Sequence, residues 1–194
     1  MLSSISPVGE RGRGQRWAVT VTAYLAGSVV GGAAVGTLVG GVGALALSGL
    51  SEELRLALIA AVALVGVVAD LTVGVPSLHR QVDERWLTGY RGWVYGGGYG
   101  LQLGTGLVTV IPSSVVWATW LGAALLADPR LGALVGLTFG LVRALPLLAA
   151  GRVRTVGALR RTLAWMDRVR PRVARAVPVL QGLAGAAALV AVVV

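Results

Sequence analysis

Long apolar stretches separated by short polar loops dominate the chain. The hydrocarbon core of a bilayer is about 30 Å thick and needs about 20 helical residues to cross it. Five stretches fit this length, and they cover residues 17–47, 54–75, 93–127, 131–150 and 177–194. The pattern predicts an all-α fold: a polytopic integral membrane helical bundle in which five transmembrane helices form one domain over residues 17–194. Residues 1–16 are expected to form a mobile cytoplasmic tail.

Two of the apolar stretches, residues 17–47 and 93–127, are longer than a bilayer requires. The first is too long for the apolar core of a cleaved signal peptide and is interpreted as a signal-anchor and first helix. The second contains Pro112 at its centre, followed by Ser113 and Ser114. Because proline disrupts helical hydrogen bonding, a kink or break is expected at this point.

The arginines predict the orientation. Fourteen of the 17 basic residues fall in the N-terminal tail and in the loops 76–92 and 151–176, whereas two, Arg55 and Arg130, fall in the alternate loops. Positive residues favour the cytoplasmic side. The chain is therefore expected to span the bacterial cytoplasmic (inner) membrane five times, with the N-terminus inside and the C-terminus outside.

Composition supports the membrane interpretation and narrows the chemistry. Hydrophobic residues make up 56% of the chain, charged residues 13%, and the mean hydropathy is +0.80. A soluble domain carries about 25% charge, so a water-soluble globule is excluded. Cysteine is absent and histidine occurs once, which excludes disulfides, thiolate chemistry, cysteine-ligated metals and bis-histidine haem.

Residues 155–170 combine apolar and basic positions in a helical pattern. Val156, Leu159, Leu163 and Met166 recur at spacings of three and four, and arginines occupy the remaining face. The segment is interpreted as an amphipathic helix on the inner membrane surface, attracted by anionic lipids. An ordinary basic loop is the alternative. Despite the net charge of +9, no nucleic-acid partner is expected, because no aromatic residues interleave with the arginines.

Glycines recur every fourth residue in three of the apolar stretches, as in a glycine zipper. Each row places three glycines on one helix face, where neighbouring backbones can approach closely. The rows are interpreted as helix-packing faces, and a narrow solute path or a sliding surface is the alternative. The glycines are Gly32, Gly36 and Gly40; Gly96, Gly100 and Gly104; and Gly132, Gly136 and Gly140.

Ionisable residues within membrane spans are rare and mark functional sites by default. Asp70 and Arg143 each lie about seven residues from the inner end of their span, so they share a depth at which an ion pair is expected. Tyr24 and Gln102 fall near the same depth, and the backbone loosened around Ser113 could offer carbonyl ligands. These five residues are the candidate substrate-binding layer. The alternative is a purely structural pair that fixes helix register.

The inner loop contains one candidate metal site. His79 stands beside Arg80, Asp83 and Glu84, but the loop is expected to be hydrated and basic, so no metal or other cofactor is predicted. No Ser/His/Asp set or phosphate-binding loop occurs in the sequence. The chain is therefore not expected to be an enzyme.

From Tyr99 onward the sequence resembles the second half of the CcdA/DsbD transmembrane family of cytochrome c biogenesis. The matching motifs are the glycine-rich run 100–106 with Ile111-Pro112-Ser113, the run 132–148 with its Gly140 and Pro146, and Gln181-Gly182-Leu183 after an arginine-rich linker. Ser113 occupies the position similar to the redox cysteine of the family, so the resemblance does not imply thiol electron transfer. It implies a helical scaffold around a central cavity, used for transport or assembly.

The sequence therefore supports two hypotheses about function. In the first, the chain is a small transport protein or permease subunit that uses the Asp70/Arg143 layer. In the second, it is a non-enzymatic accessory or assembly subunit of a larger membrane complex. A second copy of the chain or another membrane protein is the expected partner, in contact with the glycine faces.

Overall fold

The computed structural model describes residues 5–73, 85–106 and 113–193, and every regular element within these residues is helical. The elements are α1 (Pro7–Gly12), α2 (Trp17–Ala46), α3 (Glu52–Thr72), α4 (Trp86–Gly89), α5 (Gly92–Thr105), α6 (Val115–Leu125), α7 (Pro129–Ala144), α8 (Pro146–Ala149), the 3₁₀ turn η1 (Ala150–Arg152) and α9 (Val156–Val193). The predicted all-α class is confirmed for this part of the chain.

Four helical segments are long and apolar enough to cross a membrane. They are α2, α3, the segment Pro129–Arg152 that comprises α7, α8 and η1, and α9. Most large apolar side chains on these helices are exposed in the isolated chain, including Leu38, Val65, Leu134 and Leu183. An apolar surface of this extent is typical of helices that face lipid. The membrane class follows from the length and apolarity of these helices.

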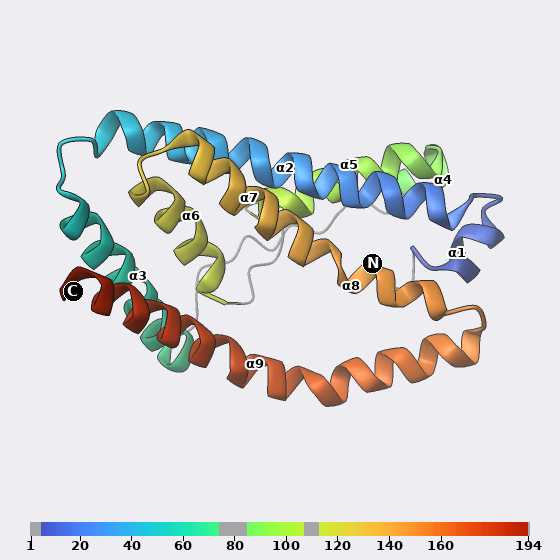
Figure 1. Ribbon diagram of the computed structural model, residues 1–194. Coiled ribbons are helices and arrows are strands. Elements are labelled where there is room, and N and C mark those ends of the chain that lie inside the picture. The colour runs from blue at the N-terminus through green and yellow to red at the C-terminus, as the bar shows by residue number, and fades with distance from the viewer. Residues whose placement is uncertain (1–4, 74–84, 107–112, 194) are drawn as a thin grey trace.

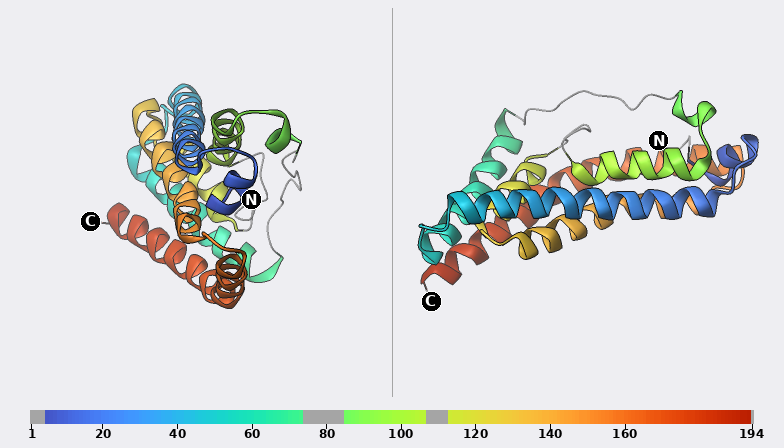
Figure 2. Two further views of the ribbon diagram at one scale, coloured as in Figure 1. Left: turned by 90° about the vertical axis from the view of Figure 1, so that its right-hand side faces the viewer. Right: turned by 90° about the horizontal axis from the view of Figure 1, so that it is seen from above.

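Helix α2 is the central element of the fold, and it packs along α5 on one side and α7 on the other (Figures 1 and 2). Glycines form both contacts. A Cβ atom added at Gly36 would overlap the carbonyl oxygen of Gly132, and one added at Gly104 would overlap that of Ser28. The α2–α7 contact is also fastened by the buried hydroxyl of Ser28, which donates to the Gly140 carbonyl at 2.7 Å.

The glycines of the three predicted rows lie at these backbone contacts. Those on α2 and α7 face one another, and those on α5 face α2. The sequence did not indicate the second face of α2, where Gly27 and Gly31 lie against the backbone of α5 at Gly97 and Leu101. Helix α2 therefore uses two adjacent glycine faces to hold two neighbours at backbone distance. Because contacts within the chain already occupy these faces, the expectation that a partner protein contacts them is wrong.

Helices α3 and the second half of α9 form a separate pair, which crosses the α2–α5–α7 bundle at an angle (Figure 2). Gly185 of α9 lies against Ala60 and Ala63 of α3. Helix α6 contacts both groups, because it packs on α2, α3 and α7. The short helix α6 is therefore the connection between the pair and the bundle.

The stretch 93–127 is interrupted, as its central proline predicts. Helix α5 is followed by Gly106 in a left-handed conformation (φ 70°), and α6 begins only at Val115. Pro112 itself lies outside the described residues. Helix α5 has 14 residues and α6 has 11. A membrane span needs about 20 residues, so each helix alone is too short to cross the bilayer.

The end of the chain differs from the prediction. The expected surface helix at 155–170 and the expected span at 177–194 are parts of one continuous helix, α9, with Pro171 and Pro178 inside it. The first half of α9 is largely exposed and runs apart from the bundle (Figure 1). Neither proline ends α9, because a helix can continue through proline with a kink when its flanking turns remain intact.

Candidate functional site

A cluster of polar side chains lies where α3, α6 and α9 meet. Asp70, in the last turn of α3, accepts hydrogen bonds from Ser113 Oγ at 2.6 Å, Ser114 N at 2.7 Å and Ser114 Oγ at 3.0 Å. Both carboxylate oxygens therefore have donors from the residues that precede α6. The carboxylate caps the start of a helix that belongs to a different part of the chain.

The backbone at the start of α6 explains the position of Asp70. The first backbone N–H groups of a helix have no partner within the helix, and its N-terminus carries partial positive charge. Ser114 is the N-cap residue of α6, but its side chain makes no cap hydrogen bond to the helix. Asp70 satisfies the Ser114 N–H instead and supplies the compensating negative charge.

Gln181 joins α9 to the same cluster. Its Nε2 atom donates to the Ala63 carbonyl at 3.0 Å and to Ser114 Oγ at 3.1 Å, and the side chain is 5% exposed. Gly66 on α3 makes room for this arrangement, because a Cβ atom there would lie 2.7 Å from Ser114 Oγ. The buried Ser114 hydroxyl at the start of α6 therefore links this helix to α3 and α9, which are distant from it in sequence.

The structure divides the predicted polar layer into two places. Ser113 joins Asp70 at the α6 terminus, whereas Arg143 lies on α7 with its guanidinium 5.3 Å from the centre of the Phe139 ring. Tyr24 is buried on α2 and interacts electrostatically with Arg143. Gln102, on α5, is half-buried. The described contacts therefore give Asp70 and Arg143 separate partners.

This separation predicts that Asp70 and Arg143 contribute independently to stability. The destabilisation caused by Asp70→Ala and by Arg143→Ala should add in the double variant, with a coupling below about 0.5 kcal/mol. Thermal unfolding of the four proteins in one mild detergent measures it. A coupling above about 1 kcal/mol would contradict this expectation and show that the ion pair predicted from the sequence exists. Recovery of stability by the charge-swapped pair, Asp70→Arg with Arg143→Asp, would show the same.

A second polar cluster was missed from the sequence. Glu10 of α1 is fully buried and accepts hydrogen bonds from Arg13 Nη2 at 2.6 Å, Thr20 Oγ1 at 2.7 Å and Tyr95 Oη at 2.6 Å. Gln15 accepts a further bond from the Gly92 N–H at 3.0 Å. The N-terminal segment from Ile5 is therefore packed onto the ends of α2 and α5, which corrects the expectation of a mobile tail.

Sequence signals for this docked segment exist. Ser6-Pro7 matches an N-cap followed by proline at the first helical position, and Glu10 falls in the first turn, three residues before Arg13. Burial lowers the pKa of the Arg13 guanidinium, but the hydrogen bonds and negative charge supplied by Glu10 and Tyr95 outweigh this effect and raise the pKa above its ordinary value. Arg13 therefore remains cationic beside Glu10 at physiological pH.

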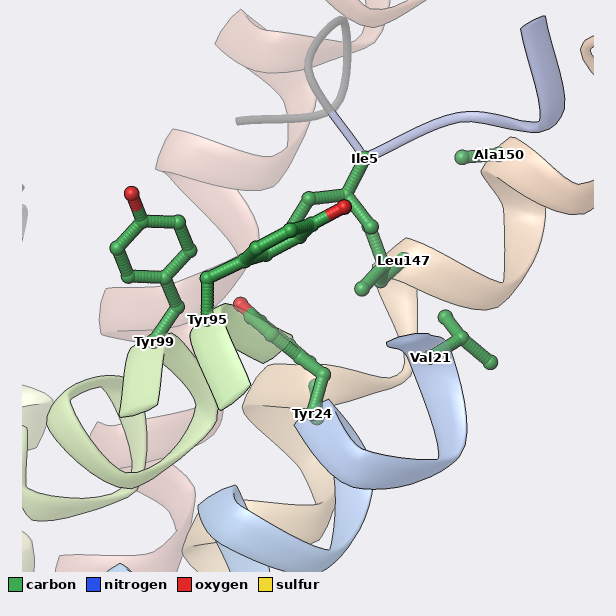
Figure 3. Close-up of a cluster of buried hydrophobic side chains, with 8 residues drawn as sticks. Ile5, Val21, Tyr24, Tyr95, Tyr99, Leu147 and Ala150 are labelled. Atoms are coloured by element: carbon green, nitrogen blue, oxygen red, sulfur yellow. The ribbon is translucent and has the colours of Figure 1, made fainter. Parts of the chain in front are cut away.

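An aromatic and aliphatic core lies beside this second cluster (Figure 3). Tyr95 and Tyr99 of α5 have ring centres 6.1 Å apart, and Trp86 of α4 stacks on Tyr99 at 6.0 Å. The side chains labelled in Figure 3 are Ile5, Val21, Tyr24, Tyr95, Tyr99, Leu147 and Ala150. The burial of Ile5 among them explains how so short a helix as α1 is held in place.

The candidate metal site at His79, with Arg80, Asp83 and Glu84, lies outside the described residues. Within the part of the chain that the structure describes, no group of three histidine, cysteine or acidic residues is placed to hold a metal ion. Both polar clusters instead consist of carboxylates with neutral or arginine donors. Within the described residues, Asp70 and Glu10 form hydrogen bonds and an ion pair with other protein groups.

Comparison with known proteins shows similarity to a curated protein. No protein-family model and no solved structure matches the chain. The chain is 30% identical over 153 residues to the methylamine utilization protein MauF of Paracoccus versutus. The match covers 75% of this chain but 56% of that protein, so the chain spans little more than half of its relative. The resemblance to the CcdA/DsbD family stays a prediction, and the similarity that the comparisons establish is to a methylamine utilization protein.

Proposed function

We propose that the protein is a non-enzymatic membrane accessory protein that acts in the utilisation of methylamine or a similar small amine. The observation that carries this proposal is the similarity to MauF over 153 residues. That similarity covers most of the chain, including several of its membrane helices. As an accessory protein it would assist the enzymes of the pathway without itself catalysing a reaction.

The polar cluster at Asp70 supports an assembly role over transport. The Asp70 carboxylate already receives three hydrogen bonds from Ser113 and Ser114. Gln181 donates hydrogen bonds to the Ala63 carbonyl of α3 and to the Ser114 hydroxyl at the start of α6. A carboxylate has about four acceptor positions and three are used here, so to hold an alkylammonium ion by more than one hydrogen bond Asp70 would have to release donors at the start of α6. The loss of these bonds would expose unsatisfied polar groups in an apolar surrounding, which is costly.

The proposal includes the cytoplasmic membrane as the location. In this arrangement α1, α4 and the beginning of α9 lie on the cytoplasmic side, in accord with the arginine distribution. The short helices α5 and α6 together take the place of one crossing, beside the four long segments. This topology has five crossings, with the N-terminus inside and the C-terminus outside.

The first half of α9 is proposed to contact anionic lipids of the inner leaflet. Its arginines are exposed, as are the apolar side chains Val156, Leu163, Trp165 and Val173. Each arginine near an anionic surface contributes about 1 kcal/mol of attraction. Pro171 and Pro178 lie between this half and the part of α9 that packs on α3, where a kink can adjust its angle to the bilayer.

Growth of the host organism tests the proposal. We expect a deletion strain to lose growth on methylamine as the nitrogen or carbon source and to retain growth on ammonium or succinate. The wild-type gene should restore growth, and so should a gene encoding Arg130→Gln, an exposed position at the start of α7. Undiminished growth of the deletion strain on methylamine would contradict the proposed function.

A further inference from the structure

Helices α6 and α7 line an open groove of about 630 Å³. Its walls include Val116 and Thr119 of α6 and Val135, Thr138 and Phe139 of α7, and Arg143 stands at one end. This volume falls within the range of about 300–1,000 Å³ that is typical of small-ligand sites. The groove shares no lining residue with either polar cluster, although Val115 on its wall directly follows Ser114 of the Asp70 cluster.

The walls of the groove select an apolar occupant. The Thr119 hydroxyl donates to the Val115 carbonyl at 2.7 Å, and the Thr138 hydroxyl to the Leu134 carbonyl at 2.9 Å. Both hydroxyl protons are therefore used within their own helices. The remaining wall is aliphatic or aromatic, which disfavours a polar solute and suits a hydrocarbon chain.

Arg143 adds a requirement for negative charge at one end. Its guanidinium packs over the Phe139 ring at 5.3 Å and has five N–H donors, so it can serve an anion in addition to its protein contacts. Arginine also pairs well with phosphate because two of its N–H groups can bond at once. A cation at the end of an apolar groove fits a molecule that joins a hydrocarbon chain to an anionic group.

The surroundings of the groove indicate where such a molecule comes from. Leu134 and Val142 of α7 and Val115 of α6 line the groove and are exposed, so this face is apolar and faces lipid in a membrane. Basic pockets between transmembrane helices are known sites for anionic lipid headgroups. We propose that the α6–α7 groove binds an acyl chain of an anionic phospholipid and that Arg143 pairs with the phosphate.

Native mass spectrometry of the full chain in neutral detergent tests the assignment. Phosphatidylglycerol and phosphatidylcholine with identical chains are added separately, and bound lipids are counted. We expect the wild type to retain one phosphatidylglycerol. The occupancy of this lipid should fall roughly fivefold in Arg143→Gln. It should be unchanged in Arg130→Gln, which lies on the same helix. The basic half of α9 is unchanged in all these proteins, so their difference reports on the groove.

A second variant tests the hydrocarbon part without altering charge. Thr138→Phe fills the groove and should also remove one bound phosphatidylglycerol, while the far-ultraviolet circular dichroism confirms that the variant remains helical. Equal retention of phosphatidylcholine, an Arg143→Gln effect no larger than that of Arg130→Gln, or full binding by Thr138→Phe would overturn the proposal. Displacement of the lipid by equimolar palmitate would overturn the phospholipid assignment in favour of a fatty acid.

Discussion

Gly36→Leu is expected to abolish the folded protein, because it separates α2 from α7. A Cβ atom at this position would lie 2.8 Å from the Gly132 carbonyl carbon and 3.1 Å from the Gly136 Cα, both of which are backbone atoms that cannot rotate away. Overpacking by a single small group costs about 1–3 kcal/mol, and leucine adds three further carbons. Gly36→Ala should therefore lower the unfolding temperature, and Gly36→Leu should leave little monodisperse protein.

Gly41 provides the matched control on the same helix. Nothing lies within 4 Å of a Cβ atom added there, so Gly41→Leu introduces the same side chain into open space. Size-exclusion chromatography and thermal unfolding in one detergent compare the two variants directly. If Gly36→Leu remained monodisperse and as stable as Gly41→Leu, the close α2–α7 contact would not exist in the protein.

The second large effect is expected at Glu10. Glu10→Ala leaves the Arg13 guanidinium and the Tyr95 and Thr20 hydroxyls without their shared acceptor. The removal of one partner from a buried ion pair costs about 3–5 kcal/mol, and because the Arg13 side chain is 24% exposed, the cost here should lie near or below the lower end of this range. We expect the segment before α2 to detach as a result, while the α2–α5–α7 contacts remain.

Limited trypsin digestion measures this release, because Arg11, Arg13 and Arg16 all lie in or beside the detached segment. Cleavage after these residues should accelerate at least tenfold in Glu10→Ala. The control is Glu52→Ala, an exposed glutamate in the first turn of α3, which should digest like the wild type. Equal digestion rates for all three proteins would show that the N-terminal segment is not held by Glu10.

The membrane class and the helical fold could be predicted from the sequence, because long apolar stretches leave few alternatives. Glycine spacing indicated which face of a helix packs closely, but it could not indicate the partner. Gly31 and Gly32 are neighbours in sequence, yet the first lies against α5 and the second against α7. The choice of neighbour depends on how the helices are arranged around α2, which a single-helix pattern does not contain.

The polar residues illustrate a related limit. Asp70 and Arg143 were paired because they lie at the same predicted depth, but depth gives only the position along the membrane normal. The direction in which each side chain points decides its partner, and Asp70 points to the start of α6. The buried position of Glu10 is hard to predict for another reason. A short polar segment resembles a solvated tail unless its capping pattern is considered together with Tyr95, which lies 85 residues away.

The most direct test of an accessory role separates amine entry from amine oxidation in the deletion strain. Uptake of radiolabelled methylammonium by whole cells and methylamine oxidation by cell extracts are measured after growth in the presence of methylamine on a permissive carbon source. The account predicts wild-type initial uptake with oxidation activity lost from the extract and restored by the intact gene. Loss of uptake with undiminished oxidation in the extract would contradict it and would make the protein a transporter.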